Sequence, residues 1–430
     1  MVQDPPNSGS THAETVRSPP DPTGPADPTD PISGPAGPAR PRRIASVDIL
    51  RGFDMFWIVG ADLIVRALAE LRGWGWLGAI ATQLDHRPWQ GVTAYDVAFP
   101  LFLFIVGVSI VLSMAGRRDR PLDRQDWWRI GRRTLLLFVL GLIYSGGLRE
   151  GWDQIRWLGV LQRIAIAYAV GAVLFRVLRP RGLAITAGAI LLGYWAAMAL
   201  WPIRDVDISN DALTAQFGKA DPADAERLYQ ATDDYVRGGF DKGRNLANHL
   251  DLLLLPGRKY DGAFDPEGLF STLPAIVSTL LGLLAGLLLI DRRLTDRQRP
   301  KWLAIAGLGL LLVGHLWGLA FPIVKQLWTS SYVLVTAGWS CLLLAGAYQV
   351  VDIRGHHRWG IVFLWIGMNP ITIYMARKLV DFKAIAERLV GGPVAQTLGP
   401  YGELLVASVA LALMIWLVRF LYQRKIFLRV

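Results

Sequence analysis

A histidine, a tryptophan and an aspartate come directly before a long apolar stretch in the segment QLDHRPWQGVTAYDVAFPLFLFIVG, residues 83–107. Imidazole titrates near neutral pH, so His86 at the mouth of a membrane cavity could take a proton from an attacking amine or hydroxyl. Asp96 either caps the following helix or holds the imidazole in one tautomer. Trp89 fits either acceptor binding or anchoring at the lipid headgroups. The segment predicts a proton-transfer site at a membrane surface, with an interfacial anchor as the alternative.

The composition is that of an integral membrane protein. Of 430 residues, 52% are hydrophobic and 19% are charged, and the mean hydropathy is +0.33. Such a chain is too apolar for an ordinary soluble protein of this length. Apolar runs of about 20 residues, enough to cross a ~30 Å hydrocarbon core, recur along it. We predict an all-α polytopic membrane bundle with about ten transmembrane helices, at residues 47–68, 97–114, 134–147, 158–177, 183–202, 269–290, 302–321, 332–351, 360–380 and 404–421.

The net charge of +10 comes from basic segments beside the predicted helix ends. With a cytoplasmic N-terminus, these segments all fall on the cytoplasmic side, at residues 117–133, 176–181, 292–301, 354–358 and 424–429. We therefore predict a multi-pass protein of a bacterial inner (plasma) membrane, with both termini cytoplasmic and His86 on the opposite face. The basic charge then needs no nucleic-acid partner.

Two regions are expected along the chain. Residues 1–43 are rich in Pro and Gly and lack apolar periodicity, which predicts a disordered cytoplasmic tail. Residues 44–430 form one transmembrane domain, interrupted by a polar extracytoplasmic loop at 204–268. Within this loop, the helical character of 223–237 and 245–255 predicts short amphipathic helices that cap the outer face. Cys341 stands alone in an apolar run, which excludes an intrachain disulfide and predicts a small core residue.

Six motifs carry a family resemblance. In chain order they are SVDILRG at 46–52, HRPWQGVTAYDVAFPLFLFIVGVSI at 86–110, GVLQRIAIAY at 159–168, FDPEGLFSTLPAIVSTLLG at 264–282, FPIVKQLWTSSYVL at 321–334 and GMNPITIYM at 367–375. Together they resemble the heparan-α-glucosaminide N-acetyltransferase family of transmembrane acyltransferases. The resemblance implies acetyl transfer from cytoplasmic acetyl-CoA to a sugar or glycan acceptor on the extracytoplasmic face, with His86 as the catalytic residue.

The chain departs from the family at one position. The resemblance implies an Asn near the outer end of the first motif-bearing helix, where MFWIVGADL has Gly60. Asp62 is the nearest polar residue and could orient His86, or it could simply face water at the helix end. This departure leaves both N- and O-acetylation, and a changed acceptor, open.

Four charged or polar residues within the predicted spans are candidates for binding acyl-CoA. Asp48 and Arg51 share one helical face, either as an internal ion pair or with Arg51 bound to a CoA phosphate. Asp54, one turn further on, could join the same network. Gln162 and Arg163 must face a polar partner because charges in lipid are costly, and that partner is either structural or part of acyl-CoA.

The acceptor-side candidates lie near the predicted outer face. Asp265 and Glu267 precede a span, where they either cap the helix or bind the acceptor. Lys325 lies at the outer end of a helix. Asn369 precedes Pro370, which kinks a helix and frees a carbonyl, so both Lys325 and Asn369 could line the acyl or acceptor path. The remaining histidines lack metal-ligand spacing, and no metal is expected.

The sequence therefore predicts a membrane acyltransferase whose partners are acyl-CoA, a sugar or glycan acceptor and the lipid bilayer. A homodimer is compatible with it. Two competing classes remain: a polytopic transporter of a small envelope precursor, since buried polar residues and a kinked helix also suit translocation, and a non-catalytic scaffold, which Gly60 would fit.

Overall fold

The computed structural model describes residues 44–428 except 73, 74 and 150. The predicted disordered tail at 1–43 lies outside the described residues. The described part is mostly helical, with only four short strands, and its apolar helices confirm the predicted all-α membrane bundle. The helices are α1 (Ala45–Phe56), α2 (Asp62–Arg72), α3 (Gly75–Gln83), α4 (Ala98–Met114), α5 (Arg124–Tyr144), α6 (Val160–Val177), α7 (Pro180–Leu200), α8 (Asn210–Phe217), α9 (Pro222–Ala231), α10 (Leu246–Leu254), α11 (Thr272–Ile290), α12 (Gln298–Gly318), α13 (Ser330–Ala347), α14 (Ile361–Met368), α15 (Pro370–Leu379), α16 (Phe382–Val390), α17 (Pro393–Thr397) and α18 (Tyr401–Gln423).

Fewer described helices than the expected ten have the length and composition of a membrane span. Among the described residues, 7 helices are long and apolar enough to cross a membrane, and the pair α14–α15, bent by 68°, makes up to 8. Of the other two predicted spans, 47–68 contains several charged residues and is divided between α1 and α2, and 134–147 includes only the apolar second half of α5, whose first half is charged. The count of about ten therefore stays a prediction.

Glycines allow the central helices to approach closely. α4 packs against α11, and α1 packs against α14. A Cβ atom on Gly107 or Gly282 would collide with the backbone of the facing helix in the α4–α11 pair, and one on Gly52 would collide with α14. Such small-residue contacts associate helices in lipid, where the hydrophobic effect does not. Cys341 is buried in the adjoining core, as predicted.

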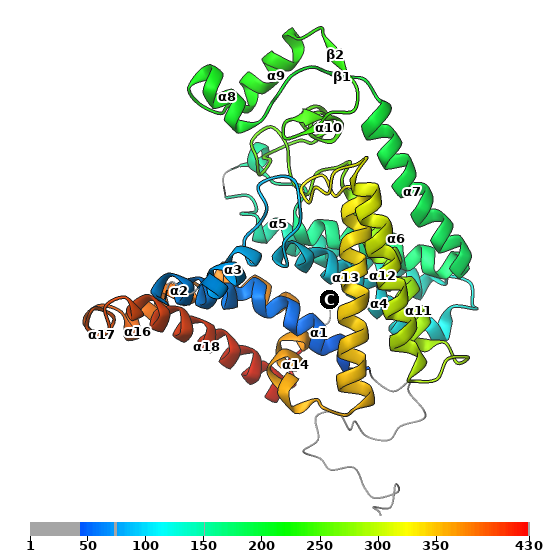
Figure 1. Cartoon of the computed structure of the whole chain (residues 1–430), viewed down its shortest axis with the longest axis vertical. Coiled ribbons are helices and arrows are strands. Elements are labelled where there is room, and N and C mark those ends of the chain that lie inside the picture. The colour runs from blue at the N-terminus through cyan, green and yellow to red at the C-terminus, as the bar shows by residue number, and fades with distance from the viewer. Residues whose placement is uncertain (1–43, 73–74, 150, 429–430) are drawn as a thin grey trace, which may run out of the picture. The chain divides into compact units, whose positions relative to one another are not determined.

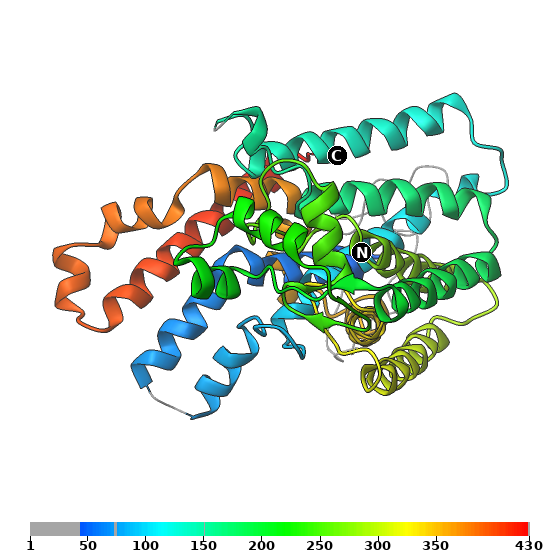
Figure 2. The same ribbon diagram turned by 90° about the horizontal axis from the view of Figure 1, so that it is seen from above.

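A cap of short elements connects α7 to α11 at one end of the bundle (Figure 1). It contains α8, α9, α10 and two antiparallel pairs, β1 (Ile203–Arg204) with β2 (Tyr235–Val236) and β3 (Phe240–Asp241) with β4 (Arg244–Asn245). The predicted short helices are confirmed, but the helical run expected at 223–237 ends at Ala231 because β2 pairs with β1. From above, the cap lies over the central helices (Figure 2).

Gly60 breaks the first predicted span. Its φ of 133° lies inside the π-helical turn Trp57–Ala61, which separates α1 from α2. Residues with a Cβ rarely adopt this conformation, whereas glycine does so readily. Beside the break, the guanidinium of Arg377 donates a hydrogen bond to the carbonyl of Ile58. The backbone conformation thus explains why a glycine occupies this position.

Candidate functional site

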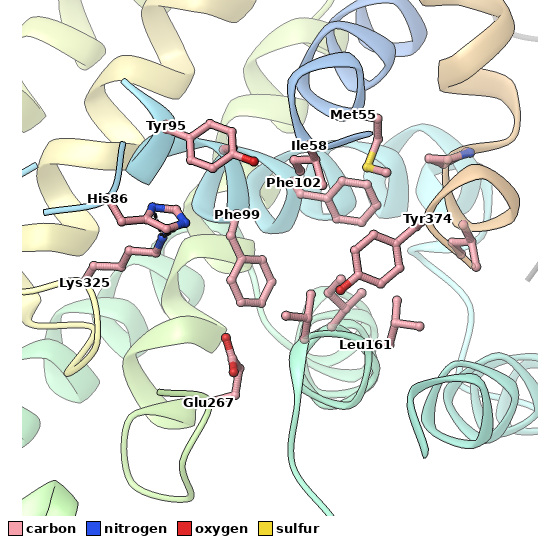
Figure 3. A pocket seen from close by; sticks show the side chains of 15 residues that line it. Met55, Ile58, His86, Tyr95, Phe99, Phe102, Leu161, Glu267, Lys325 and Tyr374 are labelled. Atoms are coloured by element: carbon pink, nitrogen blue, oxygen red, sulfur yellow. Dashed lines mark hydrogen bonds between the residues drawn. The ribbon is translucent and has the colours of Figure 1, made fainter. Parts of the chain in front are cut away.

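A cavity of about 220 Å³ lies between the first turns of α4 and α6 and the bend between α14 and α15. Much of its wall is apolar, and its polar groups come from five side chains. Figure 3 shows His86 and Lys325 beside each other on one wall, Glu267 on another, and the Tyr374 hydroxyl directed toward the middle. The fifth polar group is Tyr95, whose ring lies 4.8 Å from that of His86.

His86, Asp96 and Lys325 form one hydrogen-bonded cluster at this cavity. Nδ1 of His86 lies 2.7 Å from Oδ1 of Asp96, and Nζ of Lys325 lies 3.1 Å from the same oxygen. Lys325 Nζ is also 2.8 Å from Nδ1 of His86. The side chain of His86 is 54% exposed whereas that of Asp96 is fully buried. The imidazole can therefore reach a substrate while the carboxylate beneath it stays fixed.

Asp96 is held by the loop that precedes it. Its Oδ2 accepts hydrogen bonds from the amides of Thr93 and Arg87, at 3.1 Å and 3.3 Å, and from the Thr93 hydroxyl at 3.0 Å. The Tyr332 hydroxyl donates to the Asp96 carbonyl at 2.6 Å. No side chain caps α4, whose N-cap is Val97. The carboxylate therefore orients His86 and organises the loop, while the capping interpretation of Asp96 is wrong.

Backbone pairing between two distant loops brings Lys325 to His86. The amide of Gly91 donates to the carbonyl of Ile323 at 2.9 Å, and Gln90 forms an antiparallel bridge with Val324. The loop between α12 and α13 is thereby aligned with the loop before α4. This alignment fixes the lysine at the histidine, although 239 positions separate them in the chain.

Two titratable groups of the cavity outside the spanning segments have shifted pKa values. Burial lowers the pKa of the Lys325 ammonium, and the Asp96 carboxylate opposes that shift. Burial raises the pKa of the Glu267 carboxyl, and the guanidinium groups of Arg163 and Arg156 oppose it. Both shifts favour the neutral form of the group.

Asp265 and Glu267 bind Arg156, a residue that the sequence did not single out. Nε and Nη2 of Arg156 donate to the two oxygens of Asp265, each at 2.7 Å, and Nη2 donates to Glu267 Oε2 at 2.6 Å. These carboxylates raise the pKa of Arg156 against the effect of burial. Ser271 is the N-cap of α11, so neither carboxylate caps it. Of the two, Glu267 lines the cavity.

Gln162 and Arg163 lie at the same end of the bundle as His86. Arg163 is fully buried, donates to Ser271 Oγ at 2.6 Å and to the Pro266 carbonyl at 3.0 Å, and lies 5.0 Å from the Trp328 ring. Gln162 donates to the backbone through a 3.4 Å hydrogen bond. Both side chains therefore have polar protein partners rather than lipid.

Asp48 and Arg51 lie away from the His86 cavity. Arg51 donates to Asp48 at 3.2 Å, to the Gly367 carbonyl at 3.2 Å and to Ser109 Oγ at 2.6 Å. Ser109 lies about 15 Å along α4 from its first turn, where the His86 cavity is found. The four predicted acyl-CoA ligands thus do not gather at one point. Asp54 is buried in α1.

The remaining predicted residues surround the cavity without lining it. Asp62 pairs with Arg66 at 3.7 Å, so the carboxylate that contacts His86 is Asp96. The Trp89 indole donates to the Phe240 carbonyl at 2.8 Å and ties the His86 loop to the cap. Asn369 is buried at the bend before Pro370, and its Oδ1 accepts a 3.4 Å hydrogen bond from a backbone amide near the C-terminus.

Fold and site together define a polytopic all-α membrane protein with a histidine, aspartate and lysine cluster at the edge of an apolar cavity. The model of the family described as heparan-alpha-glucosaminide N-acetyltransferase, catalytic, matches residues 43–221, which include His86 and Asp96. The resemblance seen in the motifs is therefore confirmed: over residues 43–221 the chain is similar to this family.

Two curated relatives named heparan-alpha-glucosaminide N-acetyltransferase are similar over most of the chain. The Homo sapiens protein is 28% identical over 386 residues, which cover 79% of this chain and 53% of the relative. The Mus musculus protein is 29% identical over 336 residues, covering 69% of this chain and 49% of the relative. The chain spans about half the length of these curated relatives.

Proposed function

We propose that the protein is a membrane acetyltransferase that moves an acetyl group from cytoplasmic acetyl-CoA to a sugar or glycan acceptor at the extracytoplasmic face. The observation that carries this proposal is the contact between half-exposed His86 and buried Asp96 at the edge of the apolar cavity. The names of the two relatives and of the family model support the acetyl group and the glycan acceptor.

His86 acts as the general base. With Nδ1–H donated to Asp96, the lone pair on Nε2, which lies 3.4 Å from Nζ of Lys325, accepts the proton of the attacking amine or hydroxyl. The acceptor nitrogen or oxygen forms a bond to the acetyl carbon as the carbon–sulfur bond of the thioester breaks, and the thiolate leaves. The ammonium group of Lys325, 3.1 Å from Oδ1 of Asp96, stabilises the ionised carboxylate and keeps it in position.

The rest of the cavity serves the two substrates. Apolar side chains, among them Ile58, Phe99 and Phe102, surround the acetyl group and exclude water that would otherwise hydrolyse the thioester. Glu267, held by Arg156, binds the amine or hydroxyl of the acceptor. Arg51 is assigned to acyl-CoA as predicted, at the cytoplasmic end of the path, whereas fully buried Arg163 is left with its protein partners.

The proposal keeps the predicted orientation. Both termini are cytoplasmic, the membrane is a bacterial inner membrane, and residues 204–268 with His86 lie outside. The basic segments beside the helix ends support this choice.

The test is acceptor-dependent release of CoA from acetyl-CoA by the purified protein in lipid nanodiscs, with a panel of amino sugars. We expect release from the wild type, loss of release in His86→Ala, and full release in His356→Ala, a matched change at an exposed loop histidine. Undiminished release in His86→Ala would contradict the mechanism. No release from folded wild type with any acceptor would instead favour a transporter or a scaffold.

A further inference from the structure

A second cavity, of about 540 Å³, opens beside the first and is strongly basic. It lies where the end of α5, the segment after α10 and the last turn of α15 meet. Five cationic side chains line it, and its described lining contains no carboxylate: the five are Arg149, Arg156, Arg258, Lys259 and Lys378.

Most of this positive charge is not neutralised by the protein. Arg156 is paired with Asp265 and Glu267. The other four cations form no ion pair with a carboxylate of the described residues, and Arg258 donates only to the Ser145 carbonyl, at 2.9 Å. A concave site with excess charge of one sign concentrates ligands of the opposite sign. Guanidinium groups also match phosphate and carboxylate oxygens in geometry.

The basic cavity and the cavity of His86 are neighbours, because two side-chain pairs lie between them. Tyr144, in its wall, stacks on Tyr374 of the other cavity with ring centroids 4.4 Å apart. Arg156, also in its wall, contacts Glu267 of the other cavity at 2.6 Å. A ligand that occupies both spaces would therefore place a charged group among the basic side chains and an uncharged end near His86.

We propose that the basic cavity is an anion subsite for the acceptor, which binds a phosphate or carboxylate group carried by the sugar. This inference rests on the proposed acetyl transfer and adds the class of acceptor: an anionic sugar whose charged group is separate from the nitrogen or oxygen that is acetylated. Arg258 and Lys378 are the exposed cations that bind the charge, and Lys259 is the half-buried one.

Binding can be measured without the reaction. Glucosamine, glucosamine 6-phosphate and glucuronate are titrated calorimetrically, without acyl-CoA, into protein held in phosphatidylcholine nanodiscs. We expect the two anionic sugars to bind at least roughly tenfold more tightly than glucosamine, since each charge-assisted pair adds about that factor. The double variant Arg258→Gln/Lys378→Gln should lose this preference. The matched variant Lys219→Gln/Arg237→Gln, which removes two exposed charges from the cap outside the cavity, should keep it.

Several results would overturn the assignment. Equal affinity for charged and uncharged sugars, or an anion preference that survives Arg258→Gln/Lys378→Gln, would exclude an anion subsite at these residues. Inorganic phosphate binding as tightly as glucosamine 6-phosphate would mean a site for free anions. Loss of sugar binding when phosphatidylglycerol is added to the nanodiscs would mean a lipid headgroup site.

The experiment also separates this inference from the proposed function. His86→Ala should keep the preference for anionic over uncharged sugars because His86 does not line the basic cavity. Charge-dependent binding without any CoA release would leave the subsite standing and refute acetyl transfer. Equal acetylation of charged and uncharged sugars, unchanged in Arg258→Gln/Lys378→Gln, would refute the subsite and leave acetyl transfer standing.

Discussion

Replacing Asp96 by Asn tests whether the buried carboxylate orients His86. The substitution keeps the shape of the side chain but removes a negative charge that lies 2.7 Å from Nδ1 of His86 and 3.1 Å from Nζ of Lys325. Hydrogen bonds to charged groups contribute about 1.5–3 kcal/mol each. Because both are weakened and the tautomer of His86 is no longer fixed, we expect a loss of about 2–4 kcal/mol of transition-state stabilisation. This corresponds to a fall of roughly 30- to 1,000-fold in the rate of acetyl transfer.

The assay is the initial rate of CoA release at varied acceptor concentration. The loss should fall on kcat more than on KM, since Asp96 does not line the cavity and touches the base rather than the acceptor. Asp62→Asn is the matched comparison, because Asp62 is also a buried carboxylate but pairs with Arg66. A rate for Asp96→Asn within about twofold of the wild type, or a larger loss in Asp62→Asn, would refute the assignment of Asp96.

Three further changes have defined outcomes. Lys325→Met should lower kcat roughly tenfold by leaving Asp96 without its ammonium partner, and Lys325→Arg should recover part of the loss in the same assay. Gly60→Ala should destabilise the fold by about 1–3 kcal/mol, since alanine is strained at a φ of 133°, and a lower thermal unfolding midpoint in detergent would show it. Burial raises the pKa of Asp251 to about 7. Its neutral form therefore stabilises the folded cap fully below about pH 4, and this contribution is lost as the pH rises through 7. Asp251→Asn should flatten the fall in the unfolding midpoint between about pH 4 and pH 7, and an unchanged slope would contradict the shift.

The helical class and the place of His86 could be predicted because both are local properties of the sequence. Apolar runs identify spans without reference to tertiary contacts, and a histidine before such a run must lie near a helix end. The partner of His86 was less certain. Asp62 and Asp96 both begin helical segments, and only the path of the loop 83–95 decides that Asp96 lies beneath the imidazole.

The roles of Lys325, Asp265 and Glu267 depended on contacts that the sequence does not encode locally. Lys325 reaches His86 through backbone pairing of two loops, and no periodicity signals that alignment. Asp265 and Glu267 are residue types typical of a helix start. Both carboxylates nevertheless accept hydrogen bonds from Arg156, more than 100 positions earlier in the chain. Arg156 stands in a polar loop among other charges, so its residue type alone gave no reason to choose it.

The burial of Asp96 beneath an exposed histidine has a consequence for the chemistry. Electrostatic attraction is stronger where water is excluded, so a fully buried carboxylate stabilises a protonated imidazole more than an exposed one would. The amides of Thr93 and Arg87 fix that carboxylate before any substrate arrives. No reorganisation is then needed when His86 takes its proton, which is the form of stabilisation that accelerates a reaction most. Thr93→Val removes the hydroxyl that lies 3.0 Å from Oδ2 of Asp96 and 2.7 Å from the carbonyl of Asp85. Because this loop fixes the charge of Asp96, Thr93→Val should slow acetyl transfer while leaving the affinity for the acceptor unchanged.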